Sequence, residues 1–336
     1  MRRIFTALSI IFASLAVVAG IFIWQKKAIE NSSGTETRYR IGLLQMAPIV
    51  SQNMDGFRSG MADLGYKEGQ DVTYFYRDAN GDLERLKAYA QEMANLDLNA
   101  IFVNTSPSAL AIKEATKDKK VPVIFSMVAD PIGAGIVANQ QSSENNFTGT
   151  SCAYIEIAPK RLEFLKKVLP DAKKVLLPFR KEDKSAGPAT EKILAAAGQF
   201  GLEIIPVAIS SKEDIEKILA DLNKESADVI MDPGDSMVSS MAEKIARRSL
   251  EVGVPYFALS KGEVEKGALA GYAVDYFDLG KQTSLIASQV LSGTEPKDIP
   301  FERPRKWFFS VNLRSAEAFG LAIDPIVLEE ADLVVR

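Results

Sequence analysis

Short apolar runs alternate with longer amphipathic stretches from Arg40 onward. In the amphipathic stretches the apolar residues recur every three or four positions, which is the spacing of one helix face. The short runs are rich in β-branched and aromatic residues, which favour strands. We expect strands at residues 40–46, 71–78, 100–104 and 121–126, and helices at 54–64, 83–96 and 108–118. Strands separated by helices pair in parallel with both faces covered, so this part predicts an α/β lobe.

A second series with the same order of elements follows residues 145–151 (NNFTGTS), which we interpret as a break between two lobes. We expect helices at residues 159–168, 188–200, 212–224 and 237–251, and strands at 174–179, 202–209, 228–232 and 254–259. Each series is long enough to form one compact α/β domain.

The last part of the chain contains more elements than the second series needs. These are a strand at residues 267–274, a helix at 275–293, a proline-rich connector at 295–304, a strand at 306–312 and a helix at 314–320. We therefore expect the chain to return to the first lobe and to cross back again. The predicted fold is two doubly wound Rossmann-like lobes joined by a multi-strand hinge. Residues 40–150 and 275–303 are assigned to lobe I, and residues 151–274 and 304–336 to lobe II.

An uncharged apolar segment, residues 4–24, lies near the start of the chain between basic residues. As a helix it would span about 31 Å, which is enough to cross the hydrocarbon layer of a membrane. A signal peptide would be cut after a small residue such as Ala19. An uncleaved anchor explains why apolar residues continue to Trp24, an interfacial residue type. We favour the anchor, so residues 1–39 comprise a hydrophobic anchor or signal helix and a flexible polar tether.

The basic residues before this segment keep the N-terminus in the cytoplasm and predict that the rest of the chain is exported. The predicted location is periplasmic or otherwise extracytoplasmic, with residues 4–24 holding the protein to the inner membrane. No cysteine lies near the end of the segment, which excludes lipoprotein processing.

Two absences in the composition exclude most catalytic mechanisms. The 336 residues include no histidine, which removes the commonest general base, the usual zinc ligand and the group that activates a nucleophilic serine. The single cysteine, Cys152, permits no intramolecular disulfide or cysteine metal cluster, and we interpret it as a small buried residue. A net charge of −4 with interspersed charges argues against nucleic acid as a partner. We expect neither catalysis nor a cofactor or metal.

Polar side chains gather at the carboxyl ends of the predicted strands, where doubly wound sheets bind ligands. They are Gln45, Asn104, Thr105, Ser106, Ser126, Asp130, Asp232, Asp235, Ser236 and Ser260. Acids suit an ammonium group, and hydroxyls with the free amides at the start of a helix suit a carboxylate. These residues predict a pocket between the lobes for a small zwitterion.

Several of these residues also have a purely structural explanation. Thr105, Ser106 and Asp235 precede predicted helices, where such side chains cap the first turn. Asp130 stands before a proline- and glycine-rich stretch and is equally suited to capping a turn or to contacting a ligand. Both interpretations stay open at this point.

Two glycine-containing stretches do not match the motifs that they superficially share. Residues 133–135 (GAG) lack the third glycine of a dinucleotide-binding loop and the Gly-Lys-Ser/Thr of a Walker loop. Residues 234–236 (GDS) lack the second glycine of a nucleophile elbow, and the chain has no histidine to activate Ser236. Neither phosphate binding nor hydrolysis is expected there.

Eight separated motifs occur in a recognisable order along the chain. They are RIGLLQ (40–45), GFRSGMADLGYKEGQDV (56–72), NTSPSALAIKEAT (104–116), FSMVADPIGAGIV (125–137), NFTGTS (146–151), KRLEFLKKVLPDAKKV (160–175), KGALAGYAVDYFDLGKQT (266–283) and SGTEPKDIPFE (292–302). Together they resemble the ABC-transporter substrate-binding family that includes tryptophan- and tyrosine-type binding proteins, over residues 40–333. The resemblance implies a periplasmic binding protein type I fold, no catalysis, and delivery of a small solute to a membrane permease.

The resemblance also implies particular site residues. The family's motifs fall on Thr105-Ser106-Pro107, on Ser126, Val128, Asp130 and Pro131, on Asp235-Ser236, and on the hinge residues Val274, Asp275 and Tyr276. From these we expect Asp275 to bind an ammonium group and Thr105, Ser106, Asp235 and Ser236 to form a polar rim.

Aromatic stacking and two departures from the family complete the predicted site. We expect Tyr154 or Phe179 to stack on the ligand. The family often has a polar residue where this chain has Cys152, and PFRKED at 178–183 replaces its usual stretch and places Arg180 near the cleft. The identity of the ligand is therefore not inherited from the resemblance.

The resulting hypothesis is an extracytoplasmic solute-binding protein of an ABC import system. Its two lobes close by a hinge motion on a small amino-acid-like ligand and deliver it to ABC permease and ATPase subunits. The alternative is a membrane-tethered sensing module whose closure is read by another partner protein. An enzyme on the same fold is third, because histidine is missing.

Overall fold

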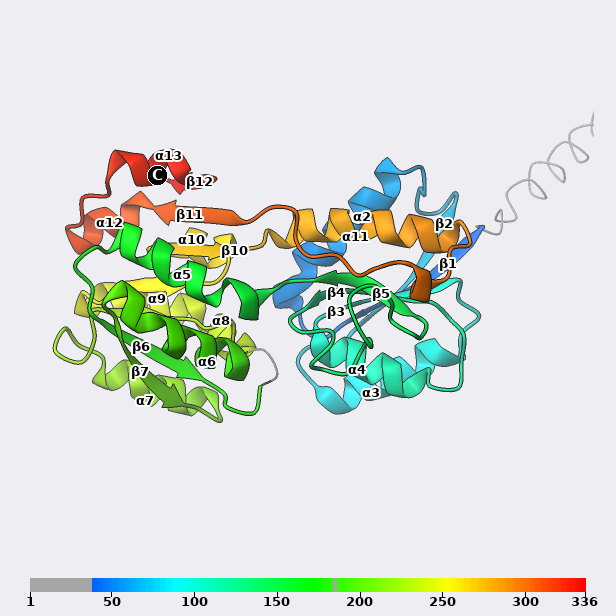
Figure 1. Cartoon of the computed structure of the whole chain (residues 1–336), viewed down its shortest axis with the longest axis horizontal. Coiled ribbons are helices and arrows are strands. Elements are labelled where there is room, and N and C mark those ends of the chain that lie inside the picture. The colour runs from blue at the N-terminus through cyan, green and yellow to red at the C-terminus, as the bar shows by residue number, and fades with distance from the viewer. Residues whose placement is uncertain (1–37, 184–185) are drawn as a thin grey trace, which may run out of the picture.

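The structure is a computed structural model that describes residues 38–183 and 186–336. It has two lobes, each built around a β-sheet, that lie side by side along the long axis of the molecule (Figure 1). The predicted hydrophobic segment at residues 4–24 lies outside the described residues. Within the two described ranges, no helix combines the length and the apolar character that a membrane span requires.

The first sheet contains five parallel strands in the order β2-β1-β3-β4-β5. They are β1 (Tyr39–Gln45), β2 (Val72–Asp78), β3 (Ala100–Asn104), β4 (Val123–Val128) and β5 (Phe147–Ser151). The interpretation of residues 145–151 as a break between lobes was wrong, because most of that stretch is the edge strand β5. Its sequence is mostly small residues and hydroxyls, which do not show a strand pattern, although all residues of the strand are buried.

Helices cover both faces of the first sheet. They are α2 (Ser51–Asp63) and α11 (Tyr276–Leu291) on one face, and α3 (Leu83–Asn95) and α4 (Ser106–Ala115) on the other (Figure 1). Successive side chains of a strand point to opposite faces. In β3, Phe102 accordingly packs with Phe57 of α2, while Ile101 and Val103 pack with Ile112 of α4. This two-sided burial explains the continuous apolar runs in the sequence.

Two glycines allow α11 to approach α2 very closely. A Cβ atom added to Gly56 would lie 2.0 Å from the carbonyl oxygen of Phe277, and one added to Gly280 would lie 2.0 Å from that of Asn53. Any side chain at either position would push the helices apart. α11 is thus packed backbone to backbone against α2.

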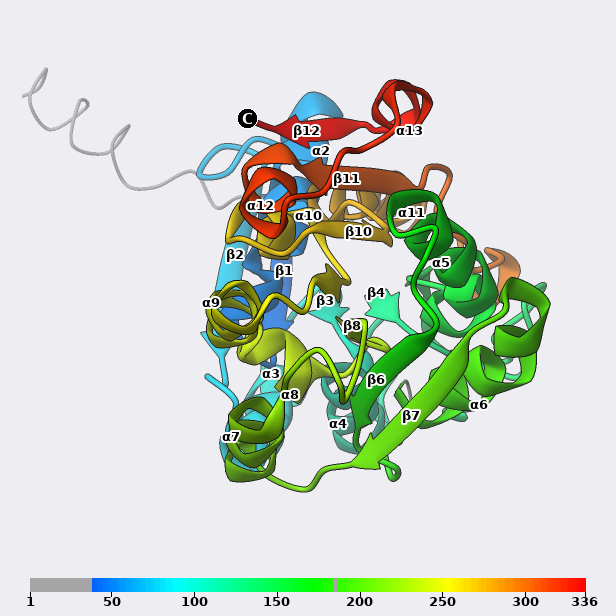
Figure 2. The ribbon, with the colours of Figure 1, turned by 90° about the vertical axis from the view of Figure 1, so that its left-hand side faces the viewer.

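The second sheet contains seven strands in the order β12-β11-β10-β9-β8-β6-β7. They are β6 (Lys174–Phe179), β7 (Glu203–Ala208), β8 (Val229–Met231), β9 (Tyr256–Ala258), β10 (Ala270–Ala273), β11 (Phe308–Asn312) and β12 (Leu333–Val335). The helices of this lobe are α5 (Tyr154–Val168), α6 (Ala186–Ala197), α7 (Lys212–Asp221), α8 (Ser236–Ser240), α9 (Ala242–Val252), α10 (Lys261–Glu265), α12 (Leu313–Phe319) and α13 (Pro325–Glu330). In Figure 2, α5 and α6 lie on one side of strands β6 to β9, and α7, α8 and α9 lie on the other.

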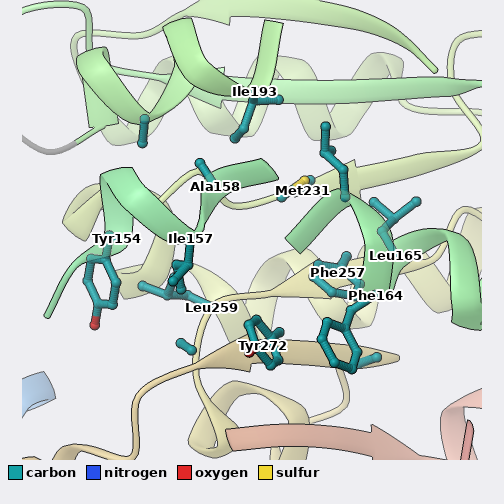
Figure 3. Packing of buried hydrophobic residues seen from close by; sticks show 14 of the residues in the cluster. Tyr154, Ile157, Ala158, Phe164, Leu165, Ile193, Met231, Phe257, Leu259 and Tyr272 are labelled. Atoms are coloured by element: carbon teal, nitrogen blue, oxygen red, sulfur yellow. The ribbon is translucent and has the colours of Figure 1, made fainter. Parts of the chain in front are cut away.

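The core of the second lobe is a large apolar cluster between α5, α6 and the sheet. Figure 3 shows Ala158 and Leu165 of α5 close to Met231 of β8, with Ile193 of α6 in the same cluster. The rings of Phe164 and Tyr272 stack with centroids 4.1 Å apart, which fixes α5 over β10. Burial of this cluster is the main source of stability of the lobe.

One pair of strands departs from the expected parallel arrangement. β10 pairs with β11 in antiparallel register, with Tyr272 opposite Phe309, whereas the other strand pairs of both sheets in the described residues are parallel. The reason is the path of the chain. β10 runs toward the first lobe and leaves the sheet there, while β11 begins where the chain returns from the first lobe and therefore runs the opposite way.

Several helices differ from the sequence prediction. α5 begins at Tyr154 rather than at residue 159, because Pro159 lies inside the helix and does not start it. The helix predicted at 237–251 is divided at Met241 into α8 and α9. The short elements α10, α13 and β12 were not predicted, since none is long enough to show a periodic pattern.

The chain passes between the two sheets three times, after β5, after β10 and before β11. The first and third passages are held together, because Ser151 N donates to Glu302 O and Glu302 N donates to Gly149 O, both at 2.9 Å. The lobe boundaries at residues 150, 274 and 303 stay a prediction.

Candidate functional site

The carboxyl ends of strands from both sheets lie at the junction between the lobes. Only Cys152 and Ala153 separate β5 from α5, and only Val274 and Asp275 separate β10 from α11. Parallel neighbours end at the same edge of a sheet, so the ends of β1, β3 and β4 lie beside that of β5, and the ends of β6, β8 and β9 beside that of β10. Most of the predicted site residues follow these strands and are thereby brought to one junction.

Gln45 ends β1 and is completely buried. Its Nε2 donates to Asp78 Oδ2 at 2.9 Å, to Ser51 Oγ at 3.0 Å and to the Tyr76 hydroxyl at 3.2 Å. The Tyr76 hydroxyl in turn donates to Asp78 Oδ2 at 3.2 Å, yet Tyr76 is 47% exposed. Burial, with Asp78 beside it, raises the pKa of Tyr76 to about 12, so the phenol is neutral. Gln45 therefore holds an aromatic ring at the rim of the first lobe.

Two buried asparagine oxygens in the first lobe have no hydrogen-bond partner among the described residues. Asn104 ends β3, and its Nδ2 lies 3.4 Å from both Gln45 Oε1 and Val50 O, while its Oδ1 is unpaired. Asn53 of α2 donates to Ser126 Oγ at 3.0 Å, and its Oδ1 is also unpaired. A buried polar atom without a partner costs about 1–3 kcal/mol. Each such atom in a native protein calls for an explanation, and an ordered water or a bound group is one.

Ser126, a predicted ligand contact, lies in a buried network of hydroxyls. Its Oγ accepts from Thr283 Oγ1 at 3.1 Å and is 3.2 Å from Thr150 Oγ1, and Thr150 and Thr283 are 2.7 Å apart. Asn53 joins this network and also donates to Tyr276 O at 3.0 Å. The network ties β4 and β5 to α2 and α11, so Ser126 braces the first lobe at its junction.

The backbone is strained where the first-lobe strands end. Thr105 after β3 has φ of 74°, Met127 in an irregular part of β4 has φ of 55°, and Ala153 after β5 has φ of 48°. Positive φ is uncommon for residues other than glycine and is costly for β-branched threonine. Strain of this kind clusters at binding sites, where the surrounding structure maintains it.

The strained Thr105 leaves the start of α4 without a side-chain cap. No capping hydrogen bond from Thr105 is present, and its Oγ1 lies 3.4 Å from Ser108 Oγ. Ser106 Oγ is 3.4 Å from the amide of Ala129, which fixes the neighbouring loop. The structure therefore does not support the explanation of Thr105 as a helix cap. Uncapped amides at a helix start attract anions.

The stretch after β4 has a structural role in this structure. Val128, predicted as a contact, is completely buried in the core between the sheet and α4. Asp130 Oδ1 accepts from Gly133 N at 2.8 Å, and a Cβ at Gly133 would lie 2.0 Å from Asp130 Oδ2. Gly135 has φ of 68°, which favours glycine. Asp130 thus caps the turn that the two glycines permit.

In the second lobe, Asp235 and Ser236 form one cluster with Arg180. Asp235 is completely buried, and its carboxylate accepts from Arg180 N at 2.8 Å, from Arg180 Nε at 3.0 Å and from Met237 N at 2.8 Å at the start of α8. Arg180 also donates to Ser236 Oγ at 2.9 Å and to Asp183 Oδ2 at 2.7 Å. The arginine noted in the sequence therefore organises this corner of the site.

Asp275, the expected ammonium partner, already has a cationic neighbour. Its side chain is almost completely buried, accepts from Asp278 N at 2.9 Å at the start of α11, and forms an ion pair with Lys261. The Lys261 ammonium also lies 5.2 Å from the centre of the Phe308 ring. A ligand ammonium at Asp275 would have to displace or share this lysine.

The aromatic residues predicted to stack on a ligand differ in exposure. Tyr154 starts α5 and is buried at the edge of the second-lobe cluster, with its hydroxyl directed away from Ile157 and Ala158 (Figure 3). Burial, with the nearby phenol of Tyr276, raises the pKa of Tyr154. Phe179, at the end of β6, is only partly buried. Phe179 is thus the more accessible of the two.

Cys152 is an inert buried thiol, as the sequence predicted. It is 1% exposed and its sulfur lies 3.5 Å from Met127 O. Burial raises the pKa of this thiol far above its ordinary value. A thiol that stays protonated is a poor nucleophile.

Three charged side chains are buried directly behind the second-lobe residues of the site. Arg161 of α5, Asp232 after β8 and Glu263 of α10 are each at most 5% exposed. Burial raises the pKa of Asp232 to about 6 and that of Glu263 to about 7, despite hydrogen bonds to both carboxylates. Burial lowers the pKa of Arg161. A buried charged group is either paired with an opposite charge, or its pKa shifts so that the neutral form is favoured.

This arrangement suits binding rather than chemistry. The first-lobe side presents an uncapped helix start and unpaired amide oxygens, and the second-lobe side presents carboxylates that are already compensated by Arg180 and Lys261. In the described residues no group of three or more Cys, Asp or Glu side chains is placed to hold a metal ion. A solute with both donor and acceptor groups fits these partners.

Comparison with known proteins gives the decisive observation. A family model described as ABC transporter substrate binding protein matches residues 45–335. The chain belongs to this family. ABC substrate-binding proteins act outside the cytoplasm, bind ligands and catalyse no reaction, so this member is a solute-binding protein and not an enzyme.

Individual relatives of this substrate-binding protein agree with the family assignment. The tyrosine-binding protein of Clostridioides difficile (strain R20291) is 29% identical over 272 residues, which are 80% of this chain and 77% of the relative. The crystal structure of an ABC domain in complex with L-Trp from Streptococcus pneumonia has a TM-score of 0.81 at 25% identity, covering 89% of this chain and all of that chain. A ligand-free, open substrate-binding protein with adhesive properties from Clostridium difficile has a TM-score of 0.70 at 26% identity, covering 88% and 99%.

Several residues at the junction were not identified from the sequence of this substrate-binding protein. They are Asn53, Tyr76, Thr150, Arg161, Lys261 and Thr283. Tyr76 could have been recognised, because it stands near the end of a predicted strand. The others lie within helices or an unrecognised strand, so no local pattern distinguished them from ordinary polar positions.

Proposed function

We propose that this protein binds a small amino-acid-like ligand between its two lobes and passes it to the permease of an ABC importer. Closure of the lobes about the three crossing segments would bury the ligand, because contacts on both sides favour the closed state. The family, the two-lobed fold and the polar strand ends support this proposal.

The observation that carries the proposal is the uncapped start of α4 beside the unpaired Oδ1 of Asn104. The amides of α4 offer donors to a carboxylate, and strained Thr105 keeps a side-chain cap away from them. Asn104 Oδ1 offers an acceptor within the same lobe, and an α-amino group supplies the matching donor. A free amino acid carries both groups.

The second lobe would complete the site with charge and aromatic surface. Asp275 remains the proposed ammonium partner, with Lys261 as its competitor, and Asp235 with Ser236 forms the opposite rim. Gln45, Ser126 and Asp130 shape the site from behind. Tyr76, Phe179 and Tyr154 offer ring surface for an apolar side chain. Relatives that bind tyrosine or L-Trp make aromatic amino acids the first ligands to test.

We also propose that the protein is exported and stays attached to the cytoplasmic membrane through residues 4–24. Their uncharged apolar sequence supports this location. The same segment supports a second role, in which closure of the lobes signals to a membrane partner instead of a permease. Deleting the neighbouring transport genes would abolish uptake of the ligand under the first role and leave the cellular response intact under the second.

Isothermal titration calorimetry tests the binding proposal. The full-length protein in detergent is titrated with each common L-amino acid, and with glucose as an uncharged solute. We expect saturable binding of at least one amino acid and none of glucose. Asn104→Leu should weaken that binding at least tenfold, because the ligand loses its acceptor.

Asn99 provides the matched control for this experiment. It precedes β3 as Asn104 ends it, and its Oδ1 accepts from Arg40 N at 2.7 Å at the opposite edge of the sheet. Asn99→Leu should leave the affinity unchanged. Binding of no amino acid, or equal effects of the two substitutions, would refute the proposal.

A further inference from the structure

Arg161 is one of the most deeply buried large side chains of the protein, although it is charged. It lies in α5, is 1% exposed, and Nη2 donates to Ala258 O at 3.0 Å. The guanidinium carbon is 5.8 Å from the centre of the Phe257 ring, and Nε has no hydrogen-bond partner among the described residues. A buried cation with so few contacts is costly unless nearby negative charge compensates it.

Asp232 supplies part of that compensation and also builds the loop that carries Asp235. Its Oδ1 accepts from Gly234 N at 2.7 Å and from Asp235 N at 2.9 Å, and its Oδ2 accepts from Ser239 Oγ at 2.6 Å. These bonds fix residues 232–236 from beneath. The position of the Asp235 carboxylate therefore depends on Asp232.

Glu263 builds the second loop in the same way. Its carboxylate accepts from Leu259 N at 3.1 Å, from Ser260 Oγ at 3.0 Å and from the Tyr256 hydroxyl at 3.0 Å. These bonds fix residues 259–263, which carry Lys261, the partner of Asp275. Two loops of the site are thus held in place by hydrogen bonds to two buried carboxylates.

Asp232 and Glu263 are both bonded to the strand segment that Arg161 contacts, because Asp232 N donates to Phe257 O at 3.2 Å and the Glu263 carboxylate accepts from Leu259 N at 3.1 Å. Arg161 donates to Ala258 O, which belongs to the same peptide group as Leu259 N. The positive charge of Arg161 lowers the pKa of Asp232 against the effect of burial, and both Asp232 and Glu263 act electrostatically on Arg161. The phenols of Tyr154, Tyr256 and Tyr276 interact with these charges, and burial raises the pKa of each, so they stay neutral. The other two cations of this corner, Arg180 and Lys261, are paired with Asp235 and Asp275.

We propose that Arg161 is a positioning residue of the ligand site: its buried guanidinium balances the charge of Asp232 and Glu263, whose carboxylates hold the loops that carry Asp235 and Lys261. This inference rests on the proposed function for its link to ligand binding. Its structural part concerns the ligand-free protein and is measured separately.

The test compares Arg161→Gln with two further variants of the full-length protein. Arg161→Lys keeps the charge, and Arg161→Gln/Asp232→Asn removes a positive and a negative charge together. The control is Arg248→Gln in the same lobe, where Nε donates to Leu219 O at 2.9 Å away from both loops. Amide hydrogen exchange of ligand-free protein is followed in residues 232–236 and 259–263, at pH 8 and at pH 6.

We expect Arg161→Gln to raise exchange in both loops at least tenfold over wild type at pH 8. At pH 6 the excess should fall below threefold, because the carboxylates take up protons and no longer need the cation. The Lys variant and the double variant should stay within threefold of wild type, as should Arg248→Gln. The affinity for L-tyrosine or L-tryptophan should follow the same pattern.

A merely structural role would give different results. Exchange that rises across the whole lobe equally at both pH values, without rescue by Asp232→Asn, would overturn the inference, as would unchanged exchange in Arg161→Gln. If Arg161→Gln does not fold, the inference requires that the double variant folds and protects both loops, and failure of both overturns it. Wild type that binds no L-amino acid would count against the proposed function, and the exchange data would still decide the role of Arg161.

Discussion

The two sides of the junction are built from different chemistry. The first-lobe side relies mainly on neutral groups: the hydroxyls of Ser126, Thr150 and Thr283 and the amides of Asn53 and Asn104. The second-lobe side relies on charged groups, with Arg180 on Asp235 and Lys261 on Asp275. Neutral networks are insensitive to pH and salt, whereas partly exposed ion pairs respond to both.

This difference indicates how each side meets a ligand. The first side has unpaired acceptors and strained backbone, which raise the free energy of the ligand-free protein. A ligand that pairs with these acceptors would lower it. The second side has its charges satisfied before a ligand arrives, so a ligand there exchanges partners. The following variants test whether the two sides differ in this way.

The largest effect should be the pH dependence of the second side. Burial raises the pKa of Asp232 to about 6, above its ordinary value of 3.8, so the folded protein binds this proton more tightly than the unfolded chain does. The resulting stability is present at low pH and is lost as pH rises from about 4 to about 6. Relative to Asp232→Asn, the wild type should lose about 3 kcal/mol across this window. Thermal unfolding of both proteins between pH 4 and pH 7 measures it.

Thr283→Val on the first side is the control for this pH series. Its difference from wild type should be constant with pH, because hydroxyls do not titrate in this range. A difference that varies as strongly as that of Asp232→Asn would show that the two sides are not chemically distinct.

Removing the arginine of the second side should be the next largest effect. Arg180→Gln leaves the fully buried Asp235 without its cation and should lower the free energy of unfolding by about 2 kcal/mol, less than for a fully buried pair because Arg180 is partly exposed. Arg77→Gln breaks the exposed pair with Glu92 in the first lobe and should cost less than about 1 kcal/mol. Urea unfolding compares them, and equal costs would contradict the description of Asp235 as dependent on Arg180.

Breaking the hydroxyl network of the first side should cost slightly less. Thr283→Val keeps the shape of the side chain but leaves Ser126 and Thr150 short of a partner, which should destabilise the protein by about 1–2 kcal/mol. Thr116→Val is the matched control, since buried Thr116 bonds only to Ile112 O of its own helix. If the two substitutions lower the free energy of unfolding equally in chemical denaturation, the network does not stabilise the protein beyond a single hydrogen bond.

The smallest expected change in stability has the opposite sign. Asn104→Leu removes a buried unpaired oxygen together with only two long contacts of 3.4 Å, from Nδ2 to Gln45 Oε1 and Val50 O, and should stabilise the ligand-free protein by up to about 1 kcal/mol. The same substitution should weaken ligand binding, as described above. Clear destabilisation in a thermal melt would mean that the amide serves the fold and not a ligand.

The sequence predicted the α/β architecture because apolar periodicity distinguishes strands that are buried on both faces from helices that are buried on one. β3 was predicted with its observed bounds, since AIFVN is entirely apolar up to its last residue. β5 was missed because FTGTS has only one large apolar residue, and its burial comes from α11 and the returning chain. No local pattern carries that information.

The candidate site was predictable only as far as strand ends define it. Gln45 and Ser126 lie in β1 and β4 of the first lobe, but their partners are distant in sequence: Thr283 is 157 positions from Ser126. The pairing of Asp275 with Lys261 depends on how α10 packs beside β11, which no motif encodes. The role of these residues as ligand contacts stays a prediction.

The most direct test of this account measures amide hydrogen exchange of the full-length protein with and without the amino acid that binds most tightly. Protection should increase on both sides of the junction together, at residues 105–108 of the first lobe and at residues 234–236 and 275–278 of the second. Glucose should protect neither side. Protection confined to one side, or none at a saturating concentration, would contradict a ligand held between the lobes.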